Sequence, residues 1–366
     1  MPVFAMTAAR QILLKDYKPK SLLRLPDHTP VRARFPAIDA HNHLFNEIPP
    51  EELVRIMDAA GVSLWLNATG NVTLPLEGST YTIARRPFSV FAEQYMMAYP
   101  GRFAAFTMAE FAQWDDFVLL KDDDFAARCI QTLEQDVDQG ACGLKVTKEL
   151  GLRFTDCRGK TVAVDDPRLA PVWDRAGALG LPVLIHVSDP VGFFLPVDEQ
   201  NEHCATLQEF PAWSFADAPF GKHALLEQRN RLVARHRDTT FILPHVANHA
   251  EDLADVARLL DACPNAAIDF SARIDELGRQ PYSAREFLVR YQDRVLFGLD
   301  MPVSEAAYRC YFRFLETHDE HFDYPDYIGR FGGCSRWKIC GLDLPDAVLR
   351  KIYRDNALRL IPRLAE

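Results

Sequence analysis

The sequence predicts an α/β protein, a distorted (β/α)8 TIM barrel with long loops after strands 5 and 8. Short apolar runs alternate with longer amphipathic stretches along the chain. The apolar runs are continuous, which is typical of strands buried on both faces of a parallel sheet. Their alternation with helical segments indicates βαβ units, and eight such units favour a closed barrel.

The eight predicted strands contain most of the continuous apolar sequence. They cover residues 35–39, 61–69, 102–110, 141–150, 181–189, 239–248, 265–273 and 293–302. Amphipathic helices are expected between them, often starting after Asp or Pro and ending at Gly, as helix capping predicts. The clearest cover residues 124–140, 166–180, 223–236, 250–264, 283–292 and 345–361.

Two connections are too long to be simple turns, residues 188–235 and residues 301–344. Both are rich in aromatic residues, and long loops in compact domains are usually functional or disordered. An open doubly wound sheet is the alternative fold, but no predicted strand leads into a GxGxxG or GxxxxGKS/T loop. We expect an N-terminal arm at residues 1–34 and a single barrel domain at residues 35–366.

Composition excludes several classes of partner. The 366 residues carry a formal net charge of −10 with a pI of about 5.6, which argues against a nucleic-acid surface. No stretch approaches the roughly 18 apolar residues of a membrane span, and the N-terminus lacks the apolar core of a signal peptide. The eight cysteines form no CxxC pair, so reduced thiols are expected. We therefore expect a cytoplasmic protein with a small-molecule substrate and no nucleic-acid or membrane partner; the aromatic loops are compatible with a homodimer.

The stretch "FPAIDAHNHLFN" places His41 and His43 one residue apart, directly after the first predicted strand. Side chains at i and i+2 of a strand point to the same face, so both imidazoles can reach one cation. A capped turn would explain the pair equally well. The balance shifts towards a metal site because His186, His245 and Asp300 stand at the ends of later predicted strands. In a parallel barrel these ends form the active-site face, and imidazole with carboxylate suits Zn, Fe, Mn or Co.

With these motifs in order, the chain resembles the amidohydrolase superfamily, in particular the branch that includes aminocarboxymuconate-semialdehyde decarboxylase, resorcylate decarboxylase and sugar lactonases. The matching segments are "IDAHNH", "LIHVSD", "LPHVAN", "LFGLDMP" and the closing "DNALRL". The resemblance covers residues 35–361 and implies a distorted (β/α)8 barrel that binds a divalent metal. It implies that the metal ligands are His41, His43, His186 and Asp300.

The resemblance also implies catalytic roles for Asp300, as base towards a metal-bound water, and for His245, as an acid/base that polarises the substrate. A core histidine satisfied by a carbonyl is the alternative for His245. One Zn ion is expected, with Mn, Fe or Co as alternatives. Lys145 on the fourth strand leaves open a carbamylated lysine bridging two metals, a cationic substrate anchor, or a structural salt bridge.

Four residues are expected to bind substrate. Lys145 and Arg273 would hold an acidic group through charge-assisted hydrogen bonds, although Arg273 could instead orient Asp275 or Glu276. Phe193 and Trp337, from the two long connections, would contact a flat or sugar-like molecule. A satellite core or a dimer interface would also explain these aromatic residues.

The predicted function is metal-dependent hydrolysis of an amide, ester or lactone bond in a small organic substrate, by metal-activated water. The alternative is metal-dependent non-oxidative decarboxylation of a small aromatic or enoic acid, which a basic anchor at Lys145 or Arg273 favours mildly. A barrel that has lost activity and serves as a binding protein is a third reading. The complete set of His41, His43, His186 and Asp300 argues against it.

Overall fold

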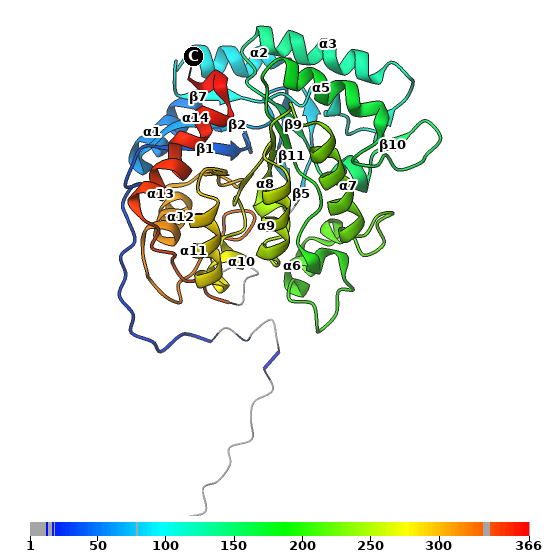
Figure 1. Cartoon of the computed structure of the whole chain (residues 1–366). Helices are drawn as coiled ribbons and strands as arrows, with labels where there is room; N and C mark the ends of the chain where they lie inside the picture. The colour runs from blue at the N-terminus through cyan, green and yellow to red at the C-terminus, as the bar shows by residue number, and fades with distance from the viewer. Residues whose placement is uncertain (1–11, 14–16, 18, 78–79, 332–336, 366) are drawn as a thin grey trace, which may run out of the picture.

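The structure is a computed structural model that describes the chain except residues 1–11, 14–16, 18, 78–79, 332–336 and 366, and except the side chains of residues 76–81. Most of the predicted N-terminal arm before residue 19 thus lies outside the described residues. The described segment ahead of the first strand runs along the outside of the barrel (Figure 1). Its Arg34 N–H donates to Glu316 at 2.9 Å and its Ala33 N–H to the Ala60 carbonyl at 2.9 Å. The division into arm and barrel domain stays a prediction.

Eight parallel strands of the described chain form the barrel wall in two hydrogen-bonded groups. The first group is β1 (Ala37–Asn42), β2 (Val62–Asn67) and β7 (Phe103–Ala105). The second, in spatial order, is β9 (Leu144–Val146), β11 (Val183–Ile185), β12 (Phe241–Leu243), β13 (Ala266–Asp269) and β14 (Val295–Leu296). Each strand falls on one of the predicted apolar runs, with β1 reaching beyond its predicted end.

Backbone contacts at two seams close these groups into a barrel. A parallel bridge joins Thr107, just after β7, to Leu144 of β9. At the other seam the Ala40 N–H donates to the Phe297 carbonyl and the Asp300 N–H donates to the His41 carbonyl, each at 2.9 Å. The predicted (β/α)8 barrel is confirmed.

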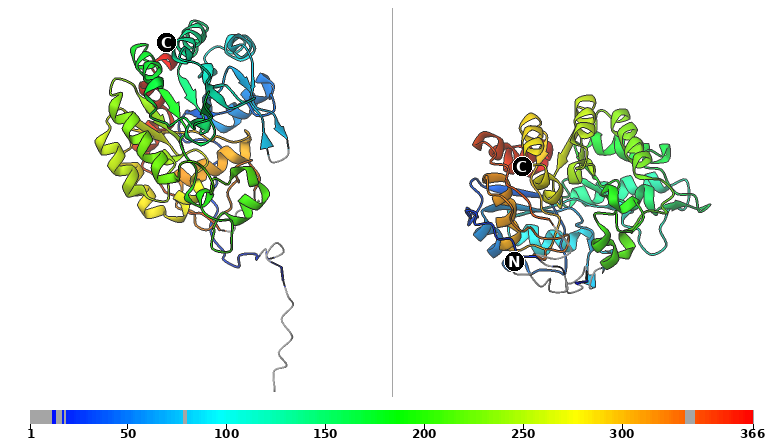
Figure 2. Two further views of the ribbon diagram at one scale, coloured as in Figure 1. Left: turned by 90° about the vertical axis from the view of Figure 1, so that its right-hand side faces the viewer. Right: turned by 90° about the horizontal axis from the view of Figure 1, so that it is seen from below.

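Helices cover the outside of the strands (Figures 1 and 2). They are α1 (Pro50–Ala60), α3 (Phe125–Asp138), α5 (Ala170–Ala178), α7 (Lys222–Arg235), α9 (Leu253–Ala262), α11 (Pro281–Arg290) and α12 (Glu305–Glu316). The predicted C-terminal helix is α13 (Asp346–Arg350), the π-turn η7 (Lys351–Asp355) and α14 (Asn356–Leu360), followed by η8 (Pro362–Leu364).

Shorter elements fill the connections. Three small strand pairs lie outside the barrel wall: β3 (Val72–Thr73) with β6 (Ala84–Arg85), β4 (Leu76–Glu77) with β5 (Thr80–Tyr81), and β8 (Val118–Leu120) with β10 (Thr155–Asp156). Short helical turns are α2 (Phe88–Phe91), η2 (Ala92–Met97), η3 (Ala109–Phe111), α4 (Glu149–Leu152), η4 (Pro167–Leu169), α8 (Pro244–Ala247) and α10 (Ile274–Arg279). None of the helices in the described part of the chain combines the length and apolarity needed to cross a membrane.

The long connection after β11 carries η5 (Val191–Phe194), α6 (Cys204–Glu209) and η6 (Pro211–Trp213) before α7 begins. The connection after β14, expected to be a loop throughout, begins instead with the twelve-residue helix α12. The Ser304 hydroxyl caps this helix by accepting from the Ala307 N–H. Its buried face includes Tyr308, Tyr311 and Phe312, so aromatic residues here form helix core rather than loop.

The barrel interior is a separate apolar cluster, made by strand residues two apart. It includes Ile38, Ala40, Leu66, Ala68, Leu184, Ile242, Ala267 and Leu296. Ala357 of α14 and the following Ile361 join this cluster. Because the interior is packed with side chains, a ligand has access only at the rim formed by the carboxyl ends of the strands.

Gly298 lies at the seam between β14 and β1. A Cβ atom at this position would stand 2.8 Å from the His41 Cβ atom and 3.0 Å from the His41 nitrogen. Both contacts are closer than side chains can adopt without a backbone shift. Glycine at 298 therefore permits the close approach that closes the barrel beside His41.

We predict that Gly298→Ala lowers the free energy of unfolding by about 1–3 kcal/mol, since it overpacks this seam. Urea denaturation measures the change. Gly221→Ala is the matched control, because no heavy atom lies within 4 Å of the added carbon and its φ of −70° suits alanine. If the two variants are equally stable, the seam does not require glycine.

Candidate metal centre

The predicted site residues gather at one end of the barrel, at or near the carboxyl ends of six strands. His41 belongs to β1 with His43 just after it, Lys145 to β9, and His186, His245, Arg273 and Asp300 follow β11, β12, β13 and β14. Strands that end at one face deliver these side chains to one place although they lie far apart in sequence.

A β-bulge in β1 aims His41 into the barrel. Asp39 pairs with Trp65 and Asn42 with Asn67, so three steps on β1 face two on β2. Ala40 belongs to the interior cluster, and yet the next residue, His41, also contacts interior side chains. Adjacent residues can share a face only where the alternation is interrupted, which is what a bulge does.

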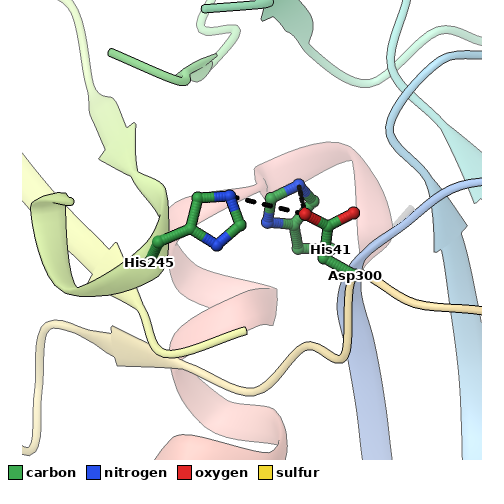
Figure 3. A group of neighbouring side chains, drawn as sticks. All are labelled: His41, His245 and Asp300. Atoms are coloured by element: carbon green, nitrogen blue, oxygen red, sulfur yellow. Dashed lines mark ion pairs between the residues drawn. The ribbon is translucent and has the colours of Figure 1, made fainter. Parts of the chain in front are cut away.

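Asp300 stands among three imidazoles. Its Oδ2 atom lies 3.4 Å from His245 Nε2 and 3.9 Å from His41 Nε2, and its Oδ1 atom lies 3.3 Å from His43 Nε2. One ligand atom each from His41, His245 and Asp300 falls within 4.8 Å of the others (Figure 3). Among the described residues, this is the group of His, Cys, Asp and Glu side chains that could hold a metal ion.

Each of these histidines is anchored through Nδ1, which leaves Nε2 directed at Asp300. His41 Nδ1 donates to the Asp269 carboxylate at 2.9 Å. His245 Nδ1 donates to the Ser271 carbonyl at 2.7 Å, and His43 Nδ1 lies 3.0 Å from the Thr69 hydroxyl. Metal-binding histidines characteristically use one ring nitrogen for such a bond and the other for the metal.

The protonation states suit a metal. Burial lowers the pKa of His43 and of His245 well below the usual value, so both rings are neutral and can act as ligands. Burial alone would raise the pKa of Asp300, but its electrostatic interactions with the neighbouring His41, His43 and Lys145 lower it to about 2. His245 Nε2 is buried and has no hydrogen-bond partner among the described residues. The donor set therefore fits a divalent ion.

His186 lies at the edge of this group. Its ring centroid is 4.5 Å from that of His245, but its Nε2 atom lies 3.0 Å from the Ser188 carbonyl and 3.5 Å from Asp189 Oδ1. Burial lowers the pKa of His186 to about 4. Its role as a metal ligand stays a prediction, as does a purely acid/base role for His245, which here faces Asp300 directly.

Lys145 is fully buried, and its Nζ atom lies 3.0 Å from His41 Nε2. Burial lowers the pKa of Lys145 to about 8, which makes the amine easier to neutralise or carbamylate. A metal bound through His41 Nε2 requires this ammonium group to move away or lose its charge. Lys145 faces His41 and does not line the neighbouring cavity. Its contact with a substrate stays a prediction.

Strained backbone marks the same end of the barrel. Ser188, His245, Ala272 and Asp300 follow four successive strands, and all have positive φ, between 49° and 75°. Such conformations cost of order 1–3 kcal/mol for non-glycine residues and cluster at functional sites.

The segment from His245 to Asn248 is wholly left-handed, with φ between 51° and 59°. Two buried cations of α7 hold it in place. The Arg229 guanidinium donates to the Ala247 carbonyl, and Lys222 Nζ donates to the Asn248 carbonyl at 2.6 Å. The Asp269 carboxylate accepts from the His245 N–H at 3.0 Å. These bonds fix the direction in which His245 projects.

A cavity opens beside His41, His245 and Asp300, which are called the metal group below. The centre of a water molecule can move in about 120 Å³ of it. Its lining comprises Lys148, His186, Asp189, Phe193, Trp213, His245, Ala272, Arg273, Asp300 and Tyr327. The predicted contacts Phe193 and Arg273 therefore line the cavity, whereas Trp337 lines a neighbouring one.

Sequence reasoning missed several residues of the site. Asp269 and Ser271 orient His41 and His245, and Tyr327 forms part of the cavity wall. Asp269 and Ser271 alternate at the end of the seventh apolar run, "AAIDFSAR", a pattern comparable to His41 and His43. Tyr327 lies in the long final connection and carries no comparable signal.

We predict that Asp269→Asn lowers metal affinity about 10- to 100-fold, because His41 loses its carboxylate partner. Titration of the metal-free protein with Zn or Mn measures the affinity, and circular dichroism checks that the barrel persists. Asp58→Asn, which alters an exposed partner of Arg102, serves as control and should bind metal normally. Unchanged affinity in Asp269→Asn would show that the carboxylate does not orient His41 for a metal.

Comparison with known proteins supports the barrel fold. Solved structures with the same fold include 2,6-dihydroxybenzoate decarboxylase from Rhizobium, at 18% identity and a TM-score of 0.53, covering 90% of this chain and 99% of that one. A dihydroxybenzoic acid decarboxylase from Polaromonas sp. JS666 with bound manganese matches at 16% identity and a TM-score of 0.52, over 90% and 97% of the two chains. An uncharacterised TIM-barrel protein, Bb4693 from Bordetella bronchiseptica, matches at 16% identity and a TM-score of 0.51, over 86% and 83%.

No curated protein sequence matches the chain. A family model described as amidohydrolase matches residues 38–363, which contain the whole barrel and all of the site residues above. The chain therefore belongs to the amidohydrolase family.

Proposed function

We propose that the protein is a metal-dependent hydrolase that cleaves an amide, ester or lactone bond in a small organic acid. The observation that supports this most directly is the convergence of His41 Nε2, His245 Nε2 and the Asp300 carboxylate beside a cavity. His43 adds a fourth ligand next to Asp300 Oδ1. These residues would hold one divalent ion, with His186 as a further ligand.

When bound there, a divalent ion lowers the pKa of a coordinated water to about 7 and polarises a carbonyl oxygen. Asp300 is the base of the proposed reaction. Its low pKa keeps it ionised at neutral pH, and it is the carboxylate that faces all three imidazoles. It would accept a proton from the attacking water and return it to the leaving group. The Ser271 carbonyl, which accepts from His245 Nδ1, would keep His245 Nε2 directed at the ion.

The charge and shape of the cavity indicate the type of substrate. Lys148 and Arg273 line it as cations, while Phe193, Trp213 and Tyr327 supply aromatic walls. Arg273 lies 5.7 Å above the Tyr327 ring, and its Nη2 atom lies 3.7 Å from Asp189. A planar acid matches such a site, because its carboxylate can pair with the cations while its body packs on the rings.

Non-oxidative decarboxylation of a small aromatic or enoic acid is the second candidate. It is favoured by the same two cations, since decarboxylation requires a bound carboxylate near the metal. The two proteins of the same fold from Rhizobium and Polaromonas are dihydroxybenzoate decarboxylases, and the second contains manganese. At 16–18% identity they share the fold, and the reaction does not transfer with it. Zn is our first choice of metal, with Mn, Fe or Co as alternatives.

We predict about one divalent ion per chain in the purified protein, measured by elemental analysis. His41→Ala combined with His43→Ala should remove both metal and activity and preserve the circular dichroism spectrum, because the barrel core lies below the site. Two ions per chain would instead support a carbamylated Lys145. A protein that binds none, even when metal is supplied, would contradict the proposed mechanism.

We predict that a screen of small aromatic and enoic acids, their esters, amides and lactones will detect acid release rather than CO2 release. The two products are measured in parallel, the acid by liquid chromatography and CO2 by a coupled assay. Asp300→Asn should keep most of the metal and lose turnover about 10²- to 10⁴-fold, as expected for loss of a general base.

Asp293→Asn, at an exposed carboxylate that pairs with Lys351, is the control and should retain activity. Release of CO2 without hydrolysis would select the decarboxylase. Full activity in Asp300→Asn would overturn the role given to this residue.

A further inference from the structure

A second cavity adjoins the metal-site cavity, beneath the connections that follow β11 and β14. The centre of a water molecule can move in about 20 Å³ of it, which is room for roughly one water-sized group. Its lining includes His203, Ile274, Asp275, Tyr311, Tyr327 and Trp337. Ala272 and Tyr327 line both cavities, so the two share a wall.

Three of the lining side chains carry a buried polar atom without a hydrogen-bond partner in the described part of the chain. These atoms are His203 Nε2, Tyr327 Oη and Trp337 Nε1. They come from two connections that are distant in sequence. Since more than 90% of buried polar groups in proteins have a partner, three unsatisfied groups around one small cavity indicate that a polar ligand completes them.

Glu276 adds a further unsatisfied group next to this cavity. Both of its carboxyl oxygens are buried and lack a partner among the described residues. It follows Asp275, which lines the cavity. Its carboxyl group is close enough to His203 and Tyr327 to influence the pKa of both. Gly192 allows this arrangement, because a Cβ atom there would stand 2.7 Å from the His203 ring.

Three groups at this cavity, Glu276, His203 and Tyr327, are held in their neutral forms. Burial, reinforced by the neighbouring Asp275, raises the pKa of Glu276 well above its usual value. Burial also lowers the pKa of His203 and raises that of Tyr327. The nearby cation Arg279 is paired with Glu202 at 2.8 Å and lies 4.1 Å above the Trp337 ring.

This chemistry selects one class of ligand. The cavity offers donors, such as the indole N–H and the phenol, together with carboxyl oxygens that accept. A metal ion is not favoured, because the described residues contain no second cluster of metal-binding side chains. An anion would face the carboxyl groups of Glu202, Asp275 and Asp326, which line the cavity. A hydroxyl or a carboxamide matches, since each is neutral and both donates and accepts hydrogen bonds.

We propose that this cavity is a distal subsite that binds a hydroxyl or carboxamide group of the substrate. The inference rests on the proposed function in one respect, that the reacting end of the same molecule lies at the metal centre. Phe193 connects the two places: its ring centroid lies 5.2 Å from that of His203 and 6.2 Å from that of Tyr327. The substrate is therefore an acid with a neutral polar group at its far end.

Isothermal titration of the metal-loaded protein with matched probes tests this subsite without requiring turnover. The probes are 4-(hydroxymethyl)benzoate against 4-ethylbenzoate, and the corresponding 3-substituted pair, which places the group at a second distance. In one of the pairs the hydroxymethyl compound should bind about tenfold or more tightly than its ethyl analogue, because the analogue leaves the buried groups unsatisfied.

Tyr327→Phe should reduce this preference to about threefold or less, since it removes a hydrogen-bonding atom of the subsite. Tyr282→Phe makes the same chemical change at a side chain that is 86% exposed, and it should keep the full preference. Because Tyr327→Phe retains the ring, a loss of preference without a change in melting temperature reports on the hydroxyl alone.

Equal affinity within each pair in the wild-type protein, or no binding of either hydroxymethyl compound, would overturn the subsite. A preference that persists in Tyr327→Phe would also overturn it. Failure of the proposed function gives a different result, in which the probe preference is present but neither acid nor CO2 is released from any compound in the substrate screen.

Discussion

The hydrogen bond from the Asp300 N–H to the His41 carbonyl is the contact on which the rest of the site depends. It closes the barrel between its last and first strands, and the two residues that make it are also members of the metal group. The same seam requires Gly298 and lies directly after the bulge in β1. Closure of the fold and assembly of the site are therefore one event, so His41 and Asp300 meet only in the complete barrel.

Buried cations stabilise strained backbone at this end of the barrel. Positive φ angles at Ser188, His245, Ala272 and Asp300 would be unfavourable in isolation. At the turn that begins with His245, hydrogen bonds offset this cost. They run from Arg229 and Lys222, two buried cations, to backbone carbonyls of the turn. Burial lowers the pKa of Arg229 to about 10 and of Lys222 to about 8, which reflects the desolvation of both groups. The direction of His245 is thus set by groups outside the metal cluster.

The sequence predicted the barrel well because its signal is local. Each buried strand is a continuous apolar run, and His41, His186, His245 and Asp300 stand at the ends of such runs. Features that depend on contacts between distant segments were not readable. The bulge that turns His41 inward, the left-handed turn at His245 and the link from His41 to Asp269 arise from pairing across strands. Helix α12 was missed because its aromatic residues resembled a loop lining, although their spacing is helical.

The two cavities differ in the charge that they present, and this difference gives the substrate a direction. The cavity at the metal group contains the cations Lys148 and Arg273, whereas the neighbouring one presents carboxyl groups together with a phenol and an indole. Both are roofed by the connections after β11 and β14, which vary independently of the barrel core. In the proposed function, the metal group would perform the reaction and the roof would select the molecule. Specificity would then depend on Phe193, His203 and Tyr327 more than on the residues that perform the chemistry.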